Sequence, residues 1–225
     1  AYQILELKPF IENSHINKIS ELKRGFVKIK LHTKEGSKDL ILAPNDLFIS
    51  SFSLQARHGK SNFAHALKAE LYNKKIDGIY LNEFDRIVII KFFKHSLILE
   101  LIGQGNKVLL DDENQIISCE KNEEWADRTI KKGEQYIFPN PNGLNPSKVS
   151  VKDLEKAFSN SEKDAIRTLI SSVNISPKVA EEIFYNLKLE KDSKAQDLKK
   201  VQLEKIAKSL KDFYTLKKTK QKTKK

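Results

Sequence analysis

The sequence predicts an α+β chain in which an antiparallel β-sandwich is followed by a small all-helical domain and a basic C-terminal helix. Three observations predict this order. The first half alternates apolar and polar residues over short runs separated by turn residues, as half-buried strands do. A proline-rich segment at 139–146 then interrupts regular structure. Beyond it, the apolar repeats have the helical period of about 3.6 residues.

The first elements are expected to be one helix and a meander of strands. Residues 2–13 predict a short helix, because Ile4, Leu7 and Ile11 share one face. Turn residues at Arg24-Gly25 and Glu35-Gly36 then separate strand-length runs. The four predicted strands are His15–Leu22, Phe26–His32, Asp39–Ala43 and Asp46–Ser51.

A second helix and a second set of strands follow. Ser61-Asn62 is suited to cap a helix from Phe63 to about Asn73. Five further strands are expected at Ile76–Leu81, Arg86–Phe93, Ser96–Ile102, Lys107–Asp111 and Gln115–Cys119. The continuous apolar runs in two of them are typical of strands covered on both faces. Together the two sets predict a two-layer antiparallel sandwich with helices packed beside it.

The proline-rich segment divides the chain into domains. We assign residues 1–139 to the sandwich domain, 140–146 to a linker, 147–190 to a helical domain and 194–225 to a basic helix with a Lys-rich tail. Short helices are expected at Val151–Phe158, Glu162–Val173 and Pro177–Leu187, and the last helix near Lys194. Its apolar stripe, which includes Leu203 and Leu210, must dock on its own domain or on the second strand of a coiled coil.

Composition and charge exclude several classes of protein. The chain has 225 residues, 39% of them hydrophobic and 32% charged, which is enough for one or two domains with a core. It has no apolar run of about 18 residues, so we expect no membrane span. The single cysteine excludes an internal disulfide framework, and a reduced, cytoplasmic location is expected. The net charge is +11, and Val201–Lys225 carries +7 of it.

No catalytic, metal or cofactor site is expected. The five histidines are scattered, and none pairs with Cys119 or a carboxylate at metal-ligand spacing. The segment Gly103-Gln104-Gly105-Asn106 lies between two strands, so it predicts a hairpin turn rather than a dinucleotide site. Two features remain: the Asp85–Arg86 pair before a strand, and a helical hairpin at Leu169–Ile183. Without a binding role, the Asp85–Arg86 pair would be a surface ion pair. The hairpin would then be an ordinary corner between two helices.

The chain also resembles a known family. The resemblance rests on the order and spacing of motifs between residues 6 and 139, and the helical region after Pro146 follows the same plan. The chain resembles the N-terminal part of the NFACT proteins of ribosome quality control (RqcH-like, formerly described as fibronectin-binding). The matching motifs are Phe63-Ala64, Leu67-Lys68 and Leu71; Lys75-Ile76; Asp85-Arg86-Ile87-Val88; Glu100-Leu101; Gly105-Asn106 through Asp111; Lys132-Gly133; Tyr136 and Pro139.

The resemblance implies a fold and a function. The family's N-terminal domain is similar to that of formamidopyrimidine-DNA glycosylases, and a helix–hairpin–helix domain and a coiled coil follow it. Family members bind the large ribosomal subunit carrying peptidyl-tRNA and recruit tRNA, usually alanyl-tRNA, so that the nascent chain is tailed. The ribosome makes the peptide bonds, so we expect an RNA-binding protein and not an enzyme. Its expected partners are the large subunit, tRNA and a second chain carrying the missing coiled-coil and RNA-binding domains.

The resemblance also names site residues. Asp85 and Arg86 match the family's Asp-Arg pair, which is implicated in tRNA handling, and Asn106 matches its Gly-Asn turn. Lys68 stands where the family usually has arginine, and Leu81 where it usually has glutamine. The family's early aspartate has no counterpart before Glu6-Leu7. A tail that contacts rRNA is expected from the C-terminal lysines: Lys217, Lys218, Lys220, Lys222, Lys224 and Lys225.

Two alternative functions stay open at this point. One is a DNA-lesion-binding or repair protein on the glycosylase-like scaffold, although the proline and glutamate that begin those enzymes are replaced by Ala1-Tyr2. The other is a coiled-coil adaptor whose last helix pairs with a partner chain and supplies the N-terminal half of a split protein.

Overall fold

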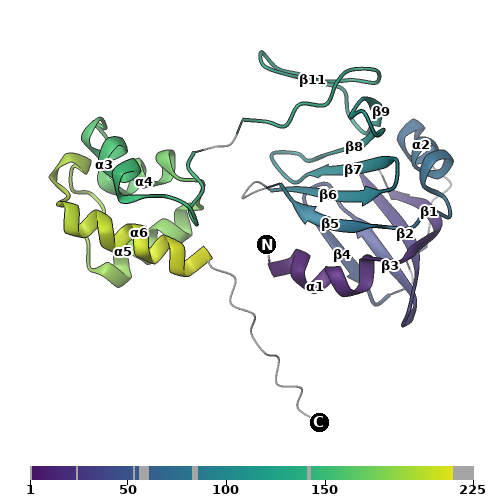
Figure 1. Ribbon diagram of the computed structural model, residues 1–225, viewed down its shortest axis with the longest axis horizontal. Helices are drawn as coiled ribbons and strands as arrows, with labels where there is room; N and C mark the ends of the chain where they lie inside the picture. Colours follow the sequence, from purple (N-terminus) through teal and green to yellow (C-terminus); the bar gives the residue numbers. More distant parts are fainter. Residues whose placement is uncertain are drawn as a thin grey trace, which may run out of the picture. The chain divides into compact units, whose positions relative to one another are not determined.

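The computed structural model describes residues 2–214 except residues 24, 53, 56–60, 83–85 and 141–142. The described residues form two compact units, the first ending at Pro139 and the second beginning at Asn140. Each unit has its own apolar core. Figure 1 shows the strands in the first unit and the helices α3 to α6 in the second. No described helix is both long enough and apolar enough to cross a membrane.

The first sheet is an antiparallel meander of four strands in chain order. Its inner face is apolar because every second residue along each strand points to that face, and these residues are aliphatic. Ile19 lies opposite Ile29, and Ile29 lies opposite Leu40. All three are buried in the core of the first unit. The strands are β1 (His15–Lys23), β2 (Phe26–Thr33), β3 (Gly36–Leu42) and β4 (Leu47–Ser50).

The second sheet is also an antiparallel meander, with five strands in chain order. Its central strand is buried from Ser96 to Glu100, as the continuous apolar run predicted. One face of this sheet shares the core with the first sheet, and the other packs a smaller cluster that includes Ile98 and Tyr136. The strands are β5 (Gly78–Leu81), β6 (Ile87–Phe92), β7 (His95–Glu100), β8 (Asn106–Leu110) and β9 (Ile116–Cys119).

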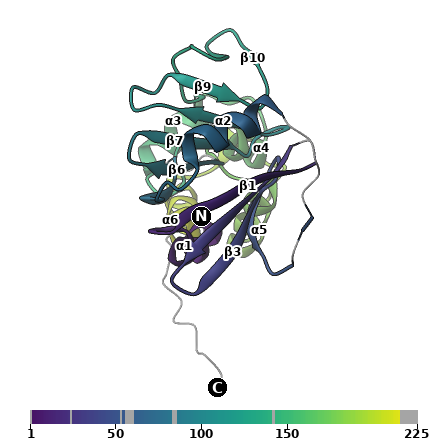
Figure 2. The same ribbon diagram turned by 90° about the vertical axis from the view of Figure 1, so that its right-hand side faces the viewer.

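Two helices close the open sides of the sandwich (Figures 1 and 2). Helix α1 (Tyr2–Ile11) contacts β5 and β2, and helix α2 (Asn62–Leu71) contacts β1 and β9. The predicted cap is confirmed, because the Ser61 hydroxyl accepts a hydrogen bond from the Ala64 amide at 3.2 Å. These features confirm the predicted α+β fold with antiparallel layers.

A short hairpin after β9 is absent from the sequence prediction. Strands β10 (Glu123–Glu124) and β11 (Thr129–Ile130) pair over only two residues each. Two residues are too few to show a period of two, so the pattern of the sequence does not reveal them.

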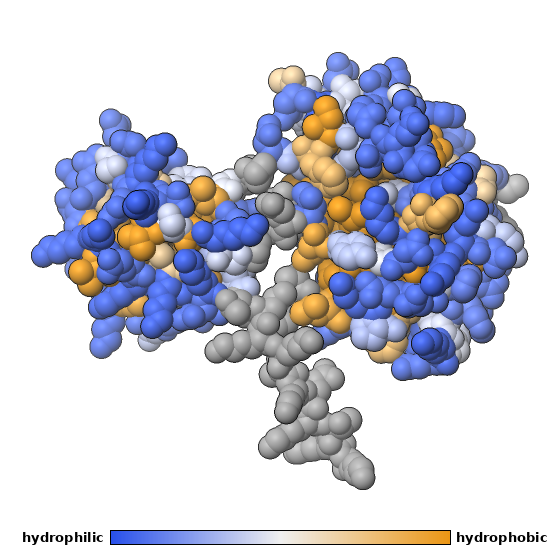
Figure 3. Space-filling model, in the orientation of Figure 1, coloured by the Kyte–Doolittle hydropathy of each residue, from blue (hydrophilic) through white to orange (hydrophobic). Residues whose placement is uncertain are grey.

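The second unit is a helical bundle. Its helices are α3 (Val151–Ser159), α4 (Ala165–Ser172), α5 (Pro177–Leu187) and α6 (Lys200–Tyr214), with a 3₁₀ turn, η1, at Ala195–Asp197. Ser150 and Asp153 form a reciprocal capping box on α3, and Ser176 caps α5 ahead of Pro177. On the face shown in Figure 3, hydrophilic residues cover most of this unit.

The structure corrects the predicted start of the last helix and decides between the two docking options for its apolar stripe. The helix begins at Lys200 and not near Lys194, because the buried Ala195 and a bridge between Lys194 and Asp164 hold that segment against the bundle. The apolar stripe does not await a coiled-coil partner. It is buried in the core of its own unit at Leu203, Ile206, Ala207 and Leu210. The adaptor hypothesis therefore loses the observation that motivated it.

Candidate nucleic-acid interface

The antiparallel order of the second sheet gathers four chain segments at one end. Ile87 lies opposite Glu100, Glu100 lies opposite Asn106, and Val108 lies opposite Cys119. The residues before β6, after β7, before β8 and after β9 therefore lie together. We call this the loop end of the second sheet, and its described members are Asn82, Arg86, residues 101–105 and residues 120–122.

Arg86 lies at the loop end with an anchored backbone and an exposed side chain. Its carbonyl accepts a hydrogen bond from the Leu101 amide at 2.7 Å, and Asn82 donates to the Ile87 carbonyl at 2.9 Å. The side chain is exposed and forms no ion pair within the described part of the chain. A guanidinium held in this way is available to an incoming anion. Its predicted partner, Asp85, lies outside the described residues.

Asn106 has a structural role that sequence reasoning did not assign. Its side chain is 1% exposed, and its amide donates to the Lys121 carbonyl at 2.9 Å and to Glu123 Oε2 at 2.7 Å. Its Oδ1 accepts from the Lys107 amide at 2.8 Å and the Lys121 amide at 3.2 Å. All the hydrogen-bonding capacity of the amide is therefore used inside the protein. The contact with RNA that the resemblance implied for Asn106 has no free donor or acceptor to make it.

The turn before Asn106 depends on glycine. Gly105 has a φ of +68°, and a Cβ at this position would lie 1.7 Å from the Pro44 carbonyl oxygen. Both facts exclude a side chain. Gly103 also has a positive φ, +57°, but a Cβ there would meet nothing within 4 Å. The positive φ angles of this turn thus belong to the two glycines and not to Asn106.

Two lysines at the loop end are held in different ways. Lys107 is buried, and its Nζ donates to the Gly25 carbonyl at 2.8 Å and to Glu120 Oε2 at 2.7 Å. Burial lowers the pKa of this ammonium in spite of Glu120. Lys121 Nζ donates to the carbonyls of Gln104 at 2.9 Å and Gly105 at 2.8 Å. No carboxylate among the described residues pairs with Lys121, so its charge is not neutralised locally.

A buried polar cluster supports the loop end from the other face of the sheet. Arg128 donates to both oxygens of Glu100, at 2.6 and 2.9 Å, and the Tyr136 hydroxyl donates to Glu100 at 2.7 Å. The Arg128 guanidinium also lies 4.4 Å from the ring centroid of Trp125. These contacts join β7 to the segment around β10 and β11, so the cluster stabilises the framework beneath Arg86.

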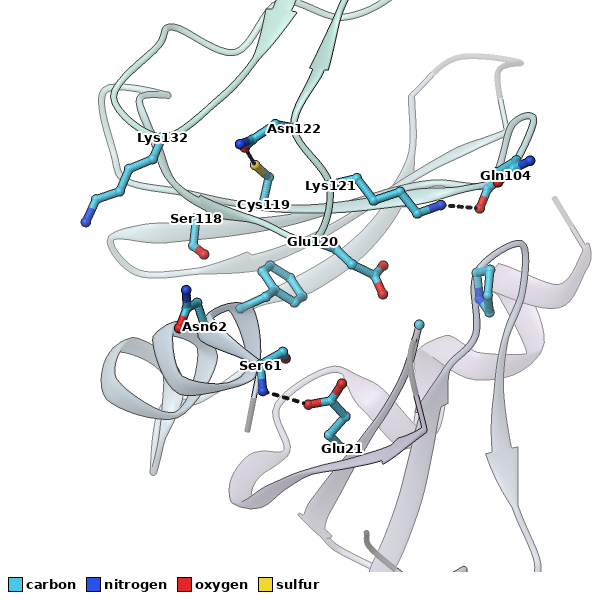
Figure 4. A pocket seen from close by; sticks show the side chains of 13 residues that line it. Glu21, Ser61, Asn62, Gln104, Ser118, Cys119, Glu120, Lys121, Asn122 and Lys132 are labelled. Carbon is cyan, nitrogen blue, oxygen red and sulfur yellow. Dashed lines mark hydrogen bonds between the residues drawn. The ribbon is translucent and has the colours of Figure 1, made fainter. Parts of the chain in front are cut away.

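A cavity of about 920 Å³ opens beside the loop end (Figure 4). Glu120 and Lys121 extend over it from the second sheet, while Ser61 and Glu21 lie on its opposite side. The Ser61 amide donates to Glu21 at 3.0 Å, which occupies one of the amides at the start of α2. The remaining lining residues are Gly25, Pro44, Asn62, Phe63, Gln104, Ser118, Cys119, Asn122 and Lys132.

Sequence reasoning did not single out Lys121 or Lys132 as lining this cavity. The position of Lys121 follows from the pairing of β8 with β9, which the sequence predicts only as neighbouring strands. Cys119 also lines the cavity, where burial raises the pKa of its thiol. Among the described residues, no three histidine, cysteine or acidic side chains gather as metal ligands would.

The structure does not bring every predicted site residue to the loop end. Lys68 is exposed in the last turn of α2, six residues beyond Asn62, which is about 9 Å along a helix. It therefore faces solvent away from the cavity mouth. The C-terminal lysines from Lys217 to Lys225 lie outside the described residues.

The helical hairpin singled out in the sequence forms a corner between α4 and α5. The Asn174 amide donates to the Leu144 carbonyl at 2.9 Å, and Leu144 donates to the Ser172 carbonyl at 2.8 Å. Gly143, with a φ of +92°, allows this close approach, because a Cβ there would lie 2.8 Å from the Ser172 oxygen. The corner is thus held by Gly143 and Leu144 of the linker, without a glycine in the turn itself.

Nearly the whole chain is similar to a known protein family. Residues 3–224 match the family described as NFACT N-terminal and middle domains. The chain is 27% identical over 199 residues to the archaeal Rqc2 homolog aRqcH of Methanocaldococcus jannaschii. That alignment covers 83% of this chain but only 29% of the relative, so the chain spans less than a third of that protein's length.

Solved structures show the same fold. The fibrinogen-binding protein of Staphylococcus aureus superposes with a TM-score of 0.74 at 19% identity, over 95% of this chain and 80% of that one. A complex of Lactococcus lactis Fpg with DNA containing an abasic site gives a TM-score of 0.52 at 14% identity, over 93% and 73% of the two chains. At these identities the likeness concerns the fold alone.

Proposed function

The chain belongs to the family of NFACT N-terminal and middle domains, and on that premise we propose that it is an RNA-binding factor of ribosome quality control. It binds the obstructed large ribosomal subunit that carries peptidyl-tRNA and helps to recruit tRNA, usually alanyl-tRNA, for tailing of the stalled chain. In this role the protein binds and positions RNA, and the ribosome makes the peptide bonds.

The family match over residues 3–224 is the observation that carries this proposal. The name of the archaeal relative, an Rqc2 homolog, supports the same process. At residue level the proposal rests on Arg86, whose exposed guanidinium stands on an anchored backbone at the loop end. A planar guanidinium binds a phosphate through two parallel hydrogen bonds, which a lysine ammonium does not offer.

Lys121 adds a second cation to the loop end, where two carbonyls orient its ammonium. Lys132 is exposed at the cavity, on the side of β9 where that strand begins. Arg86 and Lys121 together give the loop end cations suited to a folded RNA backbone. The buried Lys107–Glu120 pair, in contrast, holds the β1–β2 turn in place and is not expected to touch RNA.

Co-sedimentation tests the proposal. The purified chain is mixed at moderate salt with vacant large subunits and with large subunits that carry peptidyl-tRNA. We expect the chain to sediment with the large subunits that carry peptidyl-tRNA. A smaller fraction of the Arg86→Ala variant should sediment with them. The matched control is Lys94→Ala, which removes one exposed charge from the turn at the other end of β6.

Competition with nucleic acids separates this function from DNA repair. Deacylated tRNA and a DNA duplex with an abasic site are added as competitors, because the scaffold is also that of Fpg. Release by tRNA at far lower concentration than by DNA supports the proposal. Preference for the abasic duplex, or no binding to either kind of subunit, would contradict it.

A further inference from the structure

The first sheet carries lysines on the face that points away from the core. Ile19 and Ile29 lie opposite each other and are buried in the sandwich. The neighbouring residues Lys18 and Lys30 also lie opposite each other, and both are exposed. Because side chains alternate along a strand, these two lysines project from the outer face of the sheet. Strands β1 and β3 of this sheet lie in the foreground of Figure 2.

A second row of basic side chains lies next to this pair. His15 lies opposite His32, and a bridge places Lys75 opposite His15 on its other side. All three are exposed, and directly opposed residues point to the same face. On β2 the two rows are represented by Lys30 and His32, which are two residues or about 7 Å apart. The second row crosses three neighbouring chain segments, from His32 through His15 to Lys75, and is about 10 Å wide. We call His15, Lys18, Lys30, His32 and Lys75 the basic face.

The carboxylates that the structure describes near the basic face do not form ion pairs with its lysines. Asp39 lies opposite Lys30, but its carboxylate pairs with Lys28 at 3.5 Å. Asp77 is two residues from Lys75 and is exposed. Within the described residues, Lys18, Lys30 and Lys75 form no ion pair. Like charges placed directly opposite each other destabilise a sheet, so this arrangement does not serve the fold of the isolated chain.

We propose that the basic face binds the phosphate backbone of RNA, as a second contact surface separate from Arg86. This inference rests on the proposed function and extends it. The outer face of the first sheet points away from the second sheet, so it meets a different part of the RNA from the loop end. Lysine ammonium groups act as point charges, which suits contacts that fix the position of a strand without reading its sequence.

The composition of the face favours RNA over a protein partner. Its neighbours on β3 are polar, since Ser37 lies opposite His32 and Asp39 lies opposite Lys30. The apolar pair on this side of the sheet, Ile41 and Phe48, lies farther along β3 and β4, beyond Lys28. A protein interface requires an apolar centre from which charged residues are depleted. A nucleic-acid interface is polar and strongly positive. The basic face has the second composition.

The salt dependence of RNA binding tests the inference. Affinity for an unmodified tRNA is measured between 50 and 300 mM salt for the full chain, for the double variant Lys18→Gln/Lys30→Gln, and for the control Lys152→Gln/Lys156→Gln on α3. Each phosphate contact contributes about 0.7 to 0.9 to the slope of log K against log salt. The Lys18/Lys30 variant is expected to lose about 1.5 of that slope and at least fivefold in affinity at low salt, while the control keeps both.

The possible outcomes separate this inference from the proposed function. If Arg86→Ala weakens tRNA binding but the Lys18/Lys30 variant matches the control, the inference fails and the proposed function stands. If the full chain binds no RNA, both fail. A polyglutamate peptide is the second probe: binding of the peptide that requires Lys18 and Lys30, with tRNA binding unchanged, would assign the face to an acidic protein and overturn the inference. The melting temperature of the double variant should be unchanged or raised, whereas a decrease would mark the lysines as structural.

Discussion

Replacing Arg128 by methionine is expected to destabilise the first unit by about 3–5 kcal/mol, because a buried carboxylate loses its counter-charge. Glu100 is 4% exposed, and its two oxygens accept from Arg128 at 2.6 and 2.9 Å. Burial alone lowers the pKa of the guanidinium, but the hydrogen bond and charge of Glu100 outweigh it and raise that pKa. Methionine restores the apolar stem but not the charge.

Urea unfolding followed by tryptophan fluorescence measures this loss. Trp125 is the single tryptophan of the chain and lies 4.4 Å from the Arg128 guanidinium, so it reports on the first unit alone. The matched control is Lys38→Met, which breaks an exposed pair with Glu35 at 3.8 Å and should cost at most about 1 kcal/mol.

A double variant checks the physical reason. Adding Glu100→Gln to Arg128→Met removes the uncompensated charge, so part of the lost stability should return. If Arg128→Met costs no more than Lys38→Met, or if the second substitution recovers nothing, the buried pair does not stabilise the loop end as described.

Three further predictions concern the glycine turn, a buried tyrosine and the tail. Gly103→Ala should lower the free energy of unfolding by about 1–2 kcal/mol, because alanine disfavours the positive φ. Gly105→Ala should lower it several times more, because the new Cβ would also meet the Pro44 carbonyl. Equal losses in urea unfolding would show that this close approach is unimportant. Burial raises the pKa of Tyr136 above its ordinary value of about 10. The unfolded chain therefore loses the phenol proton at a lower pH than the folded chain. The free energy of unfolding should fall as the pH rises above about 10, by up to about 1.4 kcal/mol per pH unit. Tyr136→Phe should remove this part of the decline, and an identical pH profile would refute the assignment. Deleting 217–225 removes six lysines and should flatten the salt dependence of RNA binding, whereas an unchanged slope would make the tail an inert end.

The sequence predicted most of the regular structure because local signals agree with the fold. The parity of Ile19 and Ile29 marks the inner face of the first sheet, and Ser61 and Pro177 mark helix starts through caps that act within one turn. The start of the last helix was wrong because the bridge between Lys194 and Asp164 depends on residues thirty positions apart.

The site was less accessible to sequence reasoning for the same reason. The contacts of Glu100 reach 28 residues to Arg128 and 36 to Tyr136, and no local period encodes such distances. Asn106 shows the opposite error: its place in a family motif implied contact with RNA, but β8 places it in the interior, where four hydrogen bonds engage its amide. Arg86 was identified by resemblance, and only the fold shows its anchored backbone and exposed side chain.

Equilibrium binding of tRNA to the full chain and to Arg86→Ala and Lys94→Ala tests the central claim most directly. Loss of a charge-assisted contact should lower the affinity of Arg86→Ala about tenfold to a hundredfold, because such hydrogen bonds contribute roughly 1.5–3 kcal/mol. Lys94→Ala should stay within about twofold, and both variants should melt with the parent chain. Equal affinities for the two variants, or unfolding of the arginine variant alone, would contradict the account.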